Sequence, residues 1–390
     1  MAKTARFGII GSAGLIGTYH AEVLGKGDGP YELTAVCDIN EPRLKAQSQR
    51  LGLPGTTAAA ELVARDDVDA VIVATPHPLH AEHVIAAVEA GKDVLTEKPL
   101  AATPADARKM VKAINRTRRI GGIHYQQRSN PTFVKAKEMI QSGELGKLLC
   151  IRLTGSYYKS DYYYTLGGWR GTWRDEGGGV LINQAPHEID LLCYLAAEDK
   201  PAELTGAWTN IYHANSQVED IAAAAGVFPN GVNFILHVSV AAHGDAARFE
   251  IFGTAGAVTI VNGKFTRYIR YEQDLVDFAR SYAGPNPYAG PETHEQLLPE
   301  AGEHDPSAIH KCFAEAVLTR KRKKVLVPAA QGLWSQETIN AIFLSGYLGR
   351  KVKLPVSAAR YERMLADLIA KAPAVKRGRA QAEEGMPAIL

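Results

Sequence analysis

Short apolar runs alternate with stretches of helical periodicity along roughly the first 125 residues. The apolar runs that predict buried strands are 5–10, 33–37, 70–74, 93–95 and 120–124. The helical patterns between them cover 15–24, 42–51, 77–90 and 104–117, the last preceded by an N-cap at Thr103. Strands that are apolar throughout must be covered on both faces. The alternation therefore predicts a doubly wound α/β domain with a parallel sheet.

The pattern changes near residue 125. It predicts helices over 131–141 and 180–195, with a strand beginning near Lys147 between them. From 202 to 271 successive strands follow, and Phe228-Pro-Asn-Gly231 between two apolar runs is a hairpin signal. Residues 272–306 are polar and predict a long loop, before helices at 306–319, 329–349 and 357–371. We expect an α/β domain at 1–125, an α+β domain with an open, mostly antiparallel sheet at 126–371, and a tail at 372–390.

Composition and charge exclude several classes of protein. The 44 Lys and Arg nearly balance the 42 Asp and Glu, so there is no basic field for nucleic acid or an anionic membrane. The four cysteines are widely spaced, which argues against a disulfide framework and favours a reducing compartment. No apolar stretch approaches the ~20 residues of a membrane span, and the N-terminus does not have the pattern of a signal peptide. A cytoplasmic enzyme is the expectation.

Glycines cluster where the first strand turns into the first helix, in Gly8-Ile-Ile-Gly11-Ser-Ala-Gly14-Leu-Ile-Gly17. A backbone that turns sharply and approaches a pyrophosphate on a helix N-terminus needs glycine there. The spacing departs from G-x-G-x-x-G, because Ala13 stands in the place of the second glycine if Gly11 is the first. The residues expected to contact a dinucleotide in this loop are Gly11, Ala13, Gly14, Leu15 and Ile16.

Asp38 ends the second strand, 21 residues after Gly17 (38 − 17 = 21). An acidic residue about 20 positions after the glycines is typical of the group that binds the adenine ribose. Its carboxylate repels a 2′-phosphate, and Ile39 offers no cation in compensation, so the sequence favours NAD over NADP. Two alternatives stay open: Arg43 can reach a phosphate, and Asp38 can be a turn residue before the next helix.

Two later segments are the motifs that indicate the function most specifically. Gly91-Lys-Asp-Val-Leu-Thr-Glu97-Lys98-Pro99 follows the third helix, and Gly177-Gly-Gly-Val-Leu-Ile-Asn183-Gln-Ala-Pro-His187-Glu-Ile-Asp190 opens a helix in the second domain. With the glycine loop and Asp38, in this order, they resemble the Gfo/Idh/MocA family of sugar and cyclitol oxidoreductases. The resemblance covers essentially the whole chain. It implies an N-terminal Rossmann domain, an antiparallel sheet domain, and a nicotinamide over the cleft between them.

Removal of hydride from a carbinol carbon needs a base within hydrogen-bond reach of the hydroxyl, and a nearby cation that stabilises the developing alkoxide. The resemblance implies that Lys98 is the catalytic lysine and that His187 is the general base. Many family members have an aspartate four residues before this histidine, where this chain has Asn183. We expect Asn183 to orient His187 or a substrate hydroxyl. Either His187 acts without an anion, or Lys98 with a lowered pKa carries more of the proton transfer. Asp190 is expected to be structural, although it can partly replace the missing aspartate.

Further contacts are expected in the same segments. Those to the cofactor are Thr75, Pro76, His80, Glu97, Lys98 and Gln126. Those to the substrate are Lys98, Arg128, Tyr158, Trp169, Arg170, Asn183 and His187. Aromatic faces pack on the C–H faces of sugars and arginines donate to hydroxyls, so the segment from Tyr157 to Arg174 suits a substrate wall. An aromatic subunit interface suits it equally.

His77, His80 and His83 recur every three residues, but prolines interrupt them and no cysteine or paired carboxylate completes a site, so no metal is expected. The sequence thus favours an NAD-dependent dehydrogenase that oxidises a ring hydroxyl of a sugar, glycoside or inositol, with a homo-oligomer (dimer or tetramer) expected. Two alternatives stay open. One is a glycoside-cleaving enzyme that uses bound NAD for transient oxidation and elimination, and the other is a non-catalytic NAD-binding regulator.

Overall fold

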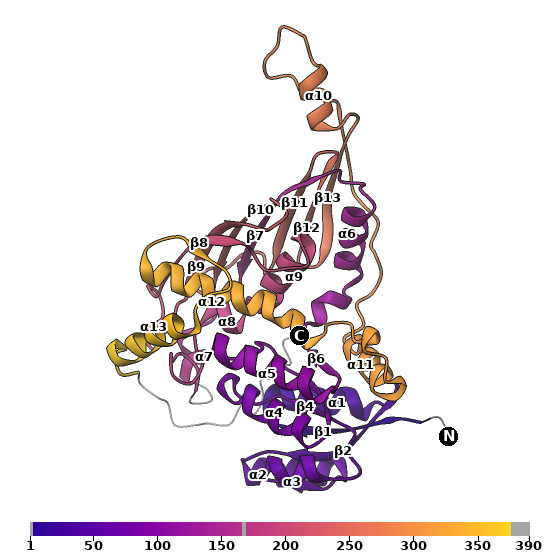
Figure 1. Ribbon diagram of the computed structural model, residues 1–390, viewed down its shortest axis with the longest axis vertical. Coiled ribbons are helices and arrows are strands. Elements are labelled where there is room, and N and C mark those ends of the chain that lie inside the picture. The colour runs from indigo at the N-terminus through magenta and orange to yellow at the C-terminus, as the bar shows by residue number, and fades with distance from the viewer. Residues whose placement is uncertain (1–2, 166–168, 376–390) are drawn as a thin grey trace.

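The computed structural model describes residues 3–165 and 169–375. Within them, six strands form a parallel sheet in the order β3-β2-β1-β4-β5-β6 (Figure 1). The strands are β1 Ala5–Ile10, β2 Tyr31–Cys37, β3 Gly55–Thr56, β4 Ala70–Val73, β5 Asp93–Thr96 and β6 Gly121–Ile123. The helices between them are α1 Leu15–Gly25, α2 Glu41–Leu51, α3 Ala59–Ala64, α4 His80–Glu89 and α5 Pro104–Thr117. The predicted doubly wound domain is confirmed, and the strand order reverses beside β1, where such sheets bind ligands.

The elements of this domain follow from burial and capping. All four residues of β4 and all four of β5 are buried, as the continuous apolar runs require. The predicted N-cap is present, because the Thr103 hydroxyl accepts a hydrogen bond from Asp106 N at 3.2 Å. The sequence pattern missed β3 and α3, which have only two and six residues and therefore show little periodicity.

A second sheet is mostly antiparallel. In the described part of the chain, nine strands follow the order β14-β13-β12-β11-β7-β10-β9-β8-β15, and only β7 and β10 pair in parallel. The strands are β7 Leu148–Ser156, β8 Glu203–Thr209, β9 Ile221–Val227, β10 Asn233–Ser239, β11 Arg248–Gly253, β12 Gly256–Val261, β13 Lys264–Tyr271, β14 Thr293–Gln296 and β15 Val352–Lys353.

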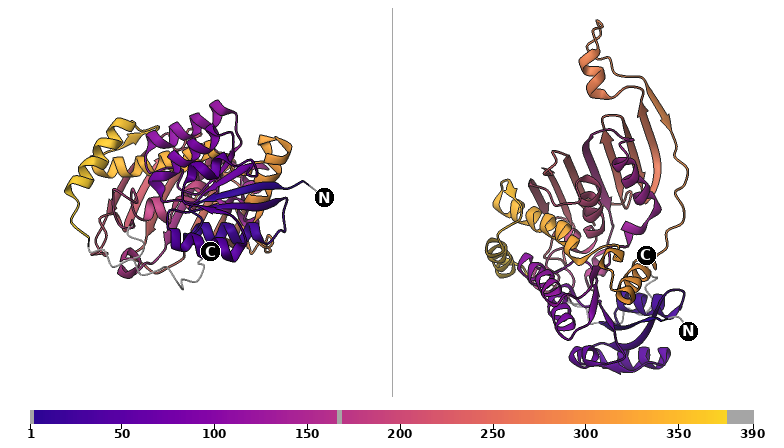
Figure 2. Two further views of the ribbon diagram at one scale, coloured as in Figure 1. Left: turned by 90° about the horizontal axis from the view of Figure 1, so that it is seen from below. Right: turned by 45° about the vertical axis from the view of Figure 1, so that its right-hand side comes forward.

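Helices cover one face of this sheet and leave the other open. Phe133, Ile189 and Ile339, from three helices, share one apolar core with strand residues such as Leu153 and Leu236. These helices are α6 Pro131–Gln141, α9 Pro186–Ala196 and α12 Gly332–Leu348. Burial in β10 alternates from Asn233 to Val238, as expected for a sheet with one solvated face. Figure 2 shows the sheet standing on the parallel-sheet domain.

Three predicted segments differ from the structure. The single helix expected at 180–195 is two, α8 Val180–Asn183 and α9, and Pro186 starts the second. The loop expected at 272–306 contains α10 Leu275–Ser281, which lies at the top of Figure 1, and β14, which pairs with β13 at the edge of the sheet. The aromatic segment contains a short helix, α7 Asp161–Thr165.

The chain returns to the first domain near its C-terminal end. Helix α11 Ala308–Thr319 places Ile309 and Phe313 in the core of the parallel sheet, where Val325 and Val327 join them. Ile123 N also donates to Val327 O at 3.0 Å. The predicted range of 126–371 for the second domain is therefore too simple, because residues around 309–329 pack with the first. Helix α13 Ala358–Lys371 ends the described helices, and among them none is long and apolar enough to cross a membrane.

The tightest contact of the glycine loop generates a prediction. A Cβ at Gly17 would lie 2.0 Å from Gly11 O and 2.7 Å from Ser12 Cα, whereas at Gly25, on the same helix, it would meet nothing within 4 Å. We expect Gly17→Ala to lose more than about 2 kcal/mol of unfolding free energy. Gly25→Ala should be neutral or stabilising by up to about 1 kcal/mol. Urea unfolding measures both, and equal effects of the two substitutions would contradict this packing.

Candidate cofactor and active site

The glycine loop ends at the N-terminus of α1, where backbone amides point out of the helix. Gly11 has φ +82°, and a Cβ there would lie 2.6 Å from Ala74 O. Gly11 N and Ser12 N both donate to Cys37 O, which fixes the turn against the end of β2. Gly14 caps α1 without a side-chain hydrogen bond, and Leu15 and Ile16 are 37% and 39% exposed. Unsatisfied amides at a helix N-terminus, beside exposed apolar side chains, suit the pyrophosphate and flat rings of a dinucleotide.

Asp38 lies against this loop, as predicted. Its Oδ2 accepts a hydrogen bond from Ala13 N at 2.9 Å, and its Oδ1 accepts one from Asn40 N at 2.9 Å. The side chain therefore also has the turn role that the sequence left open. Ile39 beside it is 91% exposed and brings no positive charge. A carboxylate at this position favours a ribose diol over a 2′-phosphate.

His80 connects the ends of β4 and β5. Its Nδ1 lies 2.8 Å from Pro99 O and its Nε2 lies 2.8 Å from Thr75 O. The imidazole is buried, and burial lowers its pKa. His80 thus fixes the loops that contain the expected cofactor contacts Thr75, Pro76 and Lys98, while its own ring nitrogens face protein carbonyls.

Lys98 reaches from the end of β5 into the second domain. Its Nζ donates to Asn183 O at 2.7 Å, across 85 residues of sequence. Burial lowers its pKa, and the carboxylates of Glu97, Glu188 and Glu176 partly oppose this. The expected cofactor contact Glu97 is turned inward instead. Its Oε2 accepts from Lys98 N at 3.0 Å, and its Oε1 faces His20 and His124.

His187 lies in the first turn of α9, close enough for the charge of Lys98 to affect its pKa. Burial, and then the charge of Lys98, lower its pKa to about 3, so the imidazole is neutral at pH 7. Its ring meets Tyr125 edge-on at 5.6 Å. Its buried Nδ1 has no hydrogen-bond partner among the described residues. The structure therefore brings Lys98, Asn183 and His187 together, and leaves a free imidazole nitrogen there.

Asn183 faces a carboxyl group that the sequence interpretation missed. Its Nδ2 donates to Glu176 Oε1 and, at 3.2 Å, to Tyr163 Oη, while no bond from its side chain to His187 occurs among the described residues. Glu176 is buried and accepts from Gly171 N at 2.5 Å, and burial raises its pKa to about 7. An acidic residue directly before Gly177-Gly-Gly was the available signal.

Part of the aromatic segment forms a wall near Lys98. The guanidinium of Arg170 lies over the rings of Tyr163 and Trp169, at 4.9 Å from each centroid. Trp169 meets His77 edge-on at 5.2 Å. The charge of Arg170 contributes to the lowered pKa of Lys98, which places the two near one another. Cation and ring faces of this kind suit a polyhydroxylated ring.

Tyr158 lies apart from this wall. It stacks on His243 at 4.1 Å and shares a 3.3 Å hydrogen bond with Tyr212, on the surface. Gln126 begins a short 3-10 helix after β6, and its buried Oε1 has no partner among the described residues. Gln126 therefore stays a predicted cofactor contact, whereas Tyr158 has contacts of its own.

Arg128 is structural, in contrast to the expected substrate contact. Its Nε and Nη2 donate to Asp190 at 2.7 and 2.8 Å, and its Nη1 donates to Gln331 Oε1 at 2.8 Å. Its guanidinium also lies over the rings of Tyr194 and Trp334. Both charged groups are buried, so this bidentate pair joins the 3-10 helix after β6 to α9. Asp190 is structural, as predicted, and does not replace the missing aspartate beside His187.

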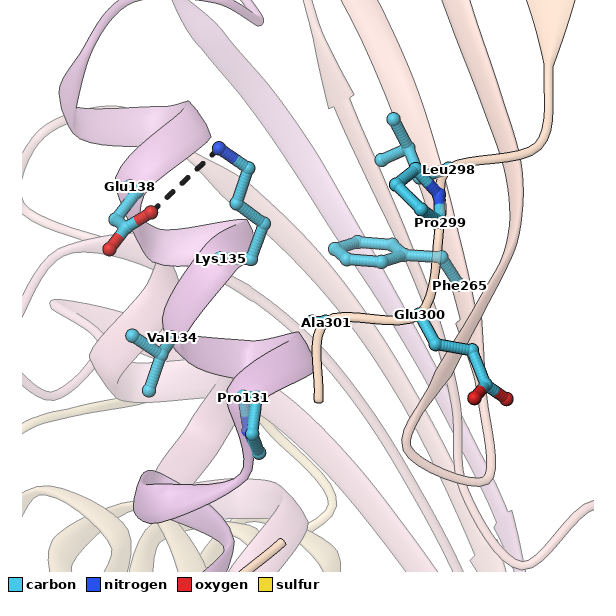
Figure 3. A pocket seen from close by; sticks show the side chains of 9 residues that line it. All are labelled: Pro131, Val134, Lys135, Glu138, Phe265, Leu298, Pro299, Glu300 and Ala301. Carbon is cyan, nitrogen blue, oxygen red and sulfur yellow. Dashed lines mark ion pairs between the residues drawn. The ribbon is translucent and has the colours of Figure 1, made fainter. Parts of the chain in front are cut away.

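A separate groove lies between α6 and the segment 298–301 (Figure 3). Phe265 forms its floor, and Lys135 pairs with Glu138 at 3.8 Å on the helix side. None of the residues discussed above lines this groove. The candidate site residues therefore lie outside this groove.

Comparison with known proteins places this geometry in a family. The model of an oxidoreductase family with an NAD-binding Rossmann fold matches residues 5–125, and the GFO/IDH/MocA C-terminal domain matches 133–259. The chain is 30% identical to 1,5-anhydro-D-fructose reductase of Ensifer adhaerens over 65% of its own length and 74% of that protein. The chain belongs to the Gfo/Idh/MocA oxidoreductase family. Its first domain is the NAD-binding domain of that family.

Other members of the family resemble the chain over much of its length. Myo-inositol 2-dehydrogenase of Thermotoga maritima is 28% identical, over 68% of this chain and 77% of that protein. Among solved structures, the WlbA dehydrogenase of Chromobacterium violaceum, in complex with NADH and UDP-GlcNAcA, has a TM-score of 0.76 and 26% identity. That match covers 91% of this chain and 97% of the other. Both Gfo/Idh/MocA domains are thus represented here.

The raised pKa of Glu176 predicts a pH-dependent stability. In the unfolded chain the carboxyl ionises near its ordinary pKa, whereas the folded chain holds the proton until about pH 7. Stability contributed by Glu176 therefore falls between about pH 4.5 and pH 7, by roughly 3 kcal/mol in all. We expect Glu176→Gln to gain stability relative to the natural chain as the pH rises from 5 to 8. Denaturant unfolding across this range measures the difference, and a constant difference would contradict a buried, protonated Glu176.

Proposed function

We propose that this chain is an NAD-dependent dehydrogenase that oxidises a secondary ring hydroxyl of a sugar, glycoside or cyclitol, or reduces the corresponding ketone. The observation that carries the proposal is the contact of Lys98 Nζ with Asn183 O at 2.7 Å. It joins the carboxyl end of a Rossmann strand to the turn before His187. Family relatives named for an anhydrofructose, myo-inositol and levoglucosan support a cyclic polyol substrate.

The residues present fit NAD. Gly11 allows the close turn, the N-terminus of α1 at Gly14 suits the pyrophosphate, and Asp38 suits the adenine ribose. When bound, NAD+ supplies the acceptor for the hydride that leaves the carbinol carbon. The protein then has two tasks, which are to orient the hydroxyl group and to receive its proton.

Lys98 is the proposed acceptor of the hydroxyl proton. A useful base has a pKa near the working pH, and burial moves the pKa of Lys98 downward toward that range. His187, with a pKa of about 3, is a weak base and stays neutral. Its proposed task is to hydrogen-bond the same oxygen and hold it toward Lys98 Nζ. The proposal therefore assigns the proton transfer to Lys98 and the orientation of the hydroxyl to His187.

Asn183 and Glu176 are proposed to position these groups. The Asn183 carbonyl holds Lys98 Nζ, and its side-chain amide is fixed by Glu176 and Tyr163. Trp169 and Arg170 are the proposed substrate wall. The indole ring of Trp169 would pack on the substrate ring, and the guanidinium of Arg170 would donate to substrate hydroxyls. A homo-oligomer stays a prediction. The exposed apolar side chain of Ile235 on the open sheet face supports it.

Replacement of Lys98 tests the function directly. We expect Lys98→Met to lower kcat by about 10²- to 10⁴-fold with a cyclic polyol that the natural chain oxidises, because the proton acceptor is lost. NAD binding, measured by calorimetry, should persist. Lys112→Met, on an exposed position of α5, is the matched control and should keep full activity. An unchanged kcat in Lys98→Met, or a natural chain that binds no NAD and oxidises no polyol in a broad panel, would overturn the proposal.

The coenzyme preference is a separate prediction. Asp38→Asn removes the charge and keeps one acceptor oxygen, so one of the two hydrogen bonds from Ala13 N and Asn40 N is lost while the repulsion of a 2′-phosphate disappears. We expect the NAD over NADP ratio of kcat/KM to fall at least about tenfold, which corresponds to about 1.4 kcal/mol. An unchanged ratio would show that Asp38 is only a turn residue.

A further inference from the structure

Three histidines from distant parts of the chain meet behind the Lys98 loop. His20 lies on α1, His124 directly follows β6, and His310 lies on α11. All three are buried, and their ring centroids are 4.9, 5.1 and 5.1 Å apart, which is close to an equilateral triangle. One ring nitrogen from each lies within 4.8 Å of the others.

Glu97 sets the proton positions of two of these rings. Its Oε1 lies 3.0 Å from His20 Nε2 and 2.8 Å from His124 Nδ1, so both nitrogens must carry a proton to donate to the carboxylate. In the neutral rings, the lone pairs are then at His20 Nδ1 and His124 Nε2. A carboxylate that fixes the tautomer of a histidine in this way is the usual outer-shell partner of a metal-binding imidazole.

Two buried nitrogens are left without a partner. His20 Nδ1 lies 2.8 Å from His310 Nε2, and because His20 Nδ1 is the acceptor, His310 Nε2 is the donor. The lone pairs of His124 Nε2 and His310 Nδ1 have no hydrogen-bond partner among the described residues. Imidazole binds a metal ion through such a lone pair.

The spacing suits a tetrahedral cation. With metal–nitrogen bonds of about 2.1 Å, two imidazole nitrogens stand about 3.4 Å apart and their ring centroids about 5 Å apart. The observed centroid distances already agree. For His310 Nε2 to become the ligand, its proton must move to Nδ1, and the 2.8 Å distance between His20 Nδ1 and His310 Nε2 must open by about 0.6 Å. Tyr19, whose ring lies 5.3 to 6.2 Å from the three histidine rings, covers the cluster and is itself only partly buried.

We propose that His20, His124 and His310 bind one divalent transition-metal ion of the Zn²⁺ class, with Glu97 as the outer-shell carboxylate. Neutral imidazoles without a thiolate select Zn²⁺ and its borderline neighbours over Mg²⁺ or Ca²⁺. The ion connects α1 and β6 to the returning helix α11, and Glu97 links it to the backbone of Lys98. Its role is structural, and it does not depend on the proposed dehydrogenase activity.

The full chain, purified without chelator and then stripped, is titrated with Zn²⁺ and separately with Co²⁺. We expect about one equivalent of either ion per chain, a tetrahedral ligand-field spectrum with Co²⁺, and a raised Tm with Zn²⁺. His310→Phe removes one ligand and breaks the fewest other contacts, so it should lose the Co²⁺ spectrum and the Zn²⁺-induced rise in Tm. The matched control is His294→Phe, in the exposed Glu272–Glu292–His294 group, and it should keep both.

A natural chain that binds neither ion stoichiometrically would overturn the proposal without any variant. Full retention of the Co²⁺ spectrum in His310→Phe, or its loss in His294→Phe, would overturn it as well. If His310→Phe does not fold, Glu97→Gln decides instead. An amide at position 97 should weaken Co²⁺ binding by about 10- to 100-fold, and an unchanged affinity would contradict the assigned outer shell.

Discussion

The hydrogen bond from Lys98 Nζ to Asn183 O is the contact on which the proposed site depends. One end belongs to the parallel sheet and the other to the short helix α8 of the second domain. The amine is partly buried there, so it exchanges water for a carbonyl, and its pKa falls. The same burial lowers the pKa of His187 and raises that of Glu176 to about 7. Desolvation around this contact between the domains therefore sets the protonation states of Lys98, His187 and Glu176.

Much of the first domain could be predicted from the sequence, because its strands are buried on both faces and its helices have long periodic patterns. The glycine loop and Asp38 were also predictable, since they lie near one another in the sequence and obey a spacing rule. Short elements such as β3 and α7 carry too few residues to show a period. The packing of α11 in the core of the first domain could not be predicted, because the sequence of an amphipathic helix does not indicate which sheet the helix covers.

The side-chain roles were harder to predict for a physical reason. Arg128 was expected at the substrate, but in the structure its donors are used by Asp190 and Gln331. Glu176 and the histidine cluster were missed, because buried polar groups find partners through tertiary packing across many residues. A buried carboxyl or imidazole needs such partners far more than an exposed one does. Sequence spacing therefore predicts loops and helix caps, whereas the partners of buried charged groups can be identified only once the fold is known.

The crystal structure of the chain bound to NADH tests the central claim most directly. We expect the nicotinamide ring to lie beside both Lys98 and His187, with the adenine ribose hydroxyls on the Asp38 carboxylate. Density that places the nicotinamide away from either side chain, or the ribose away from Asp38, would contradict it.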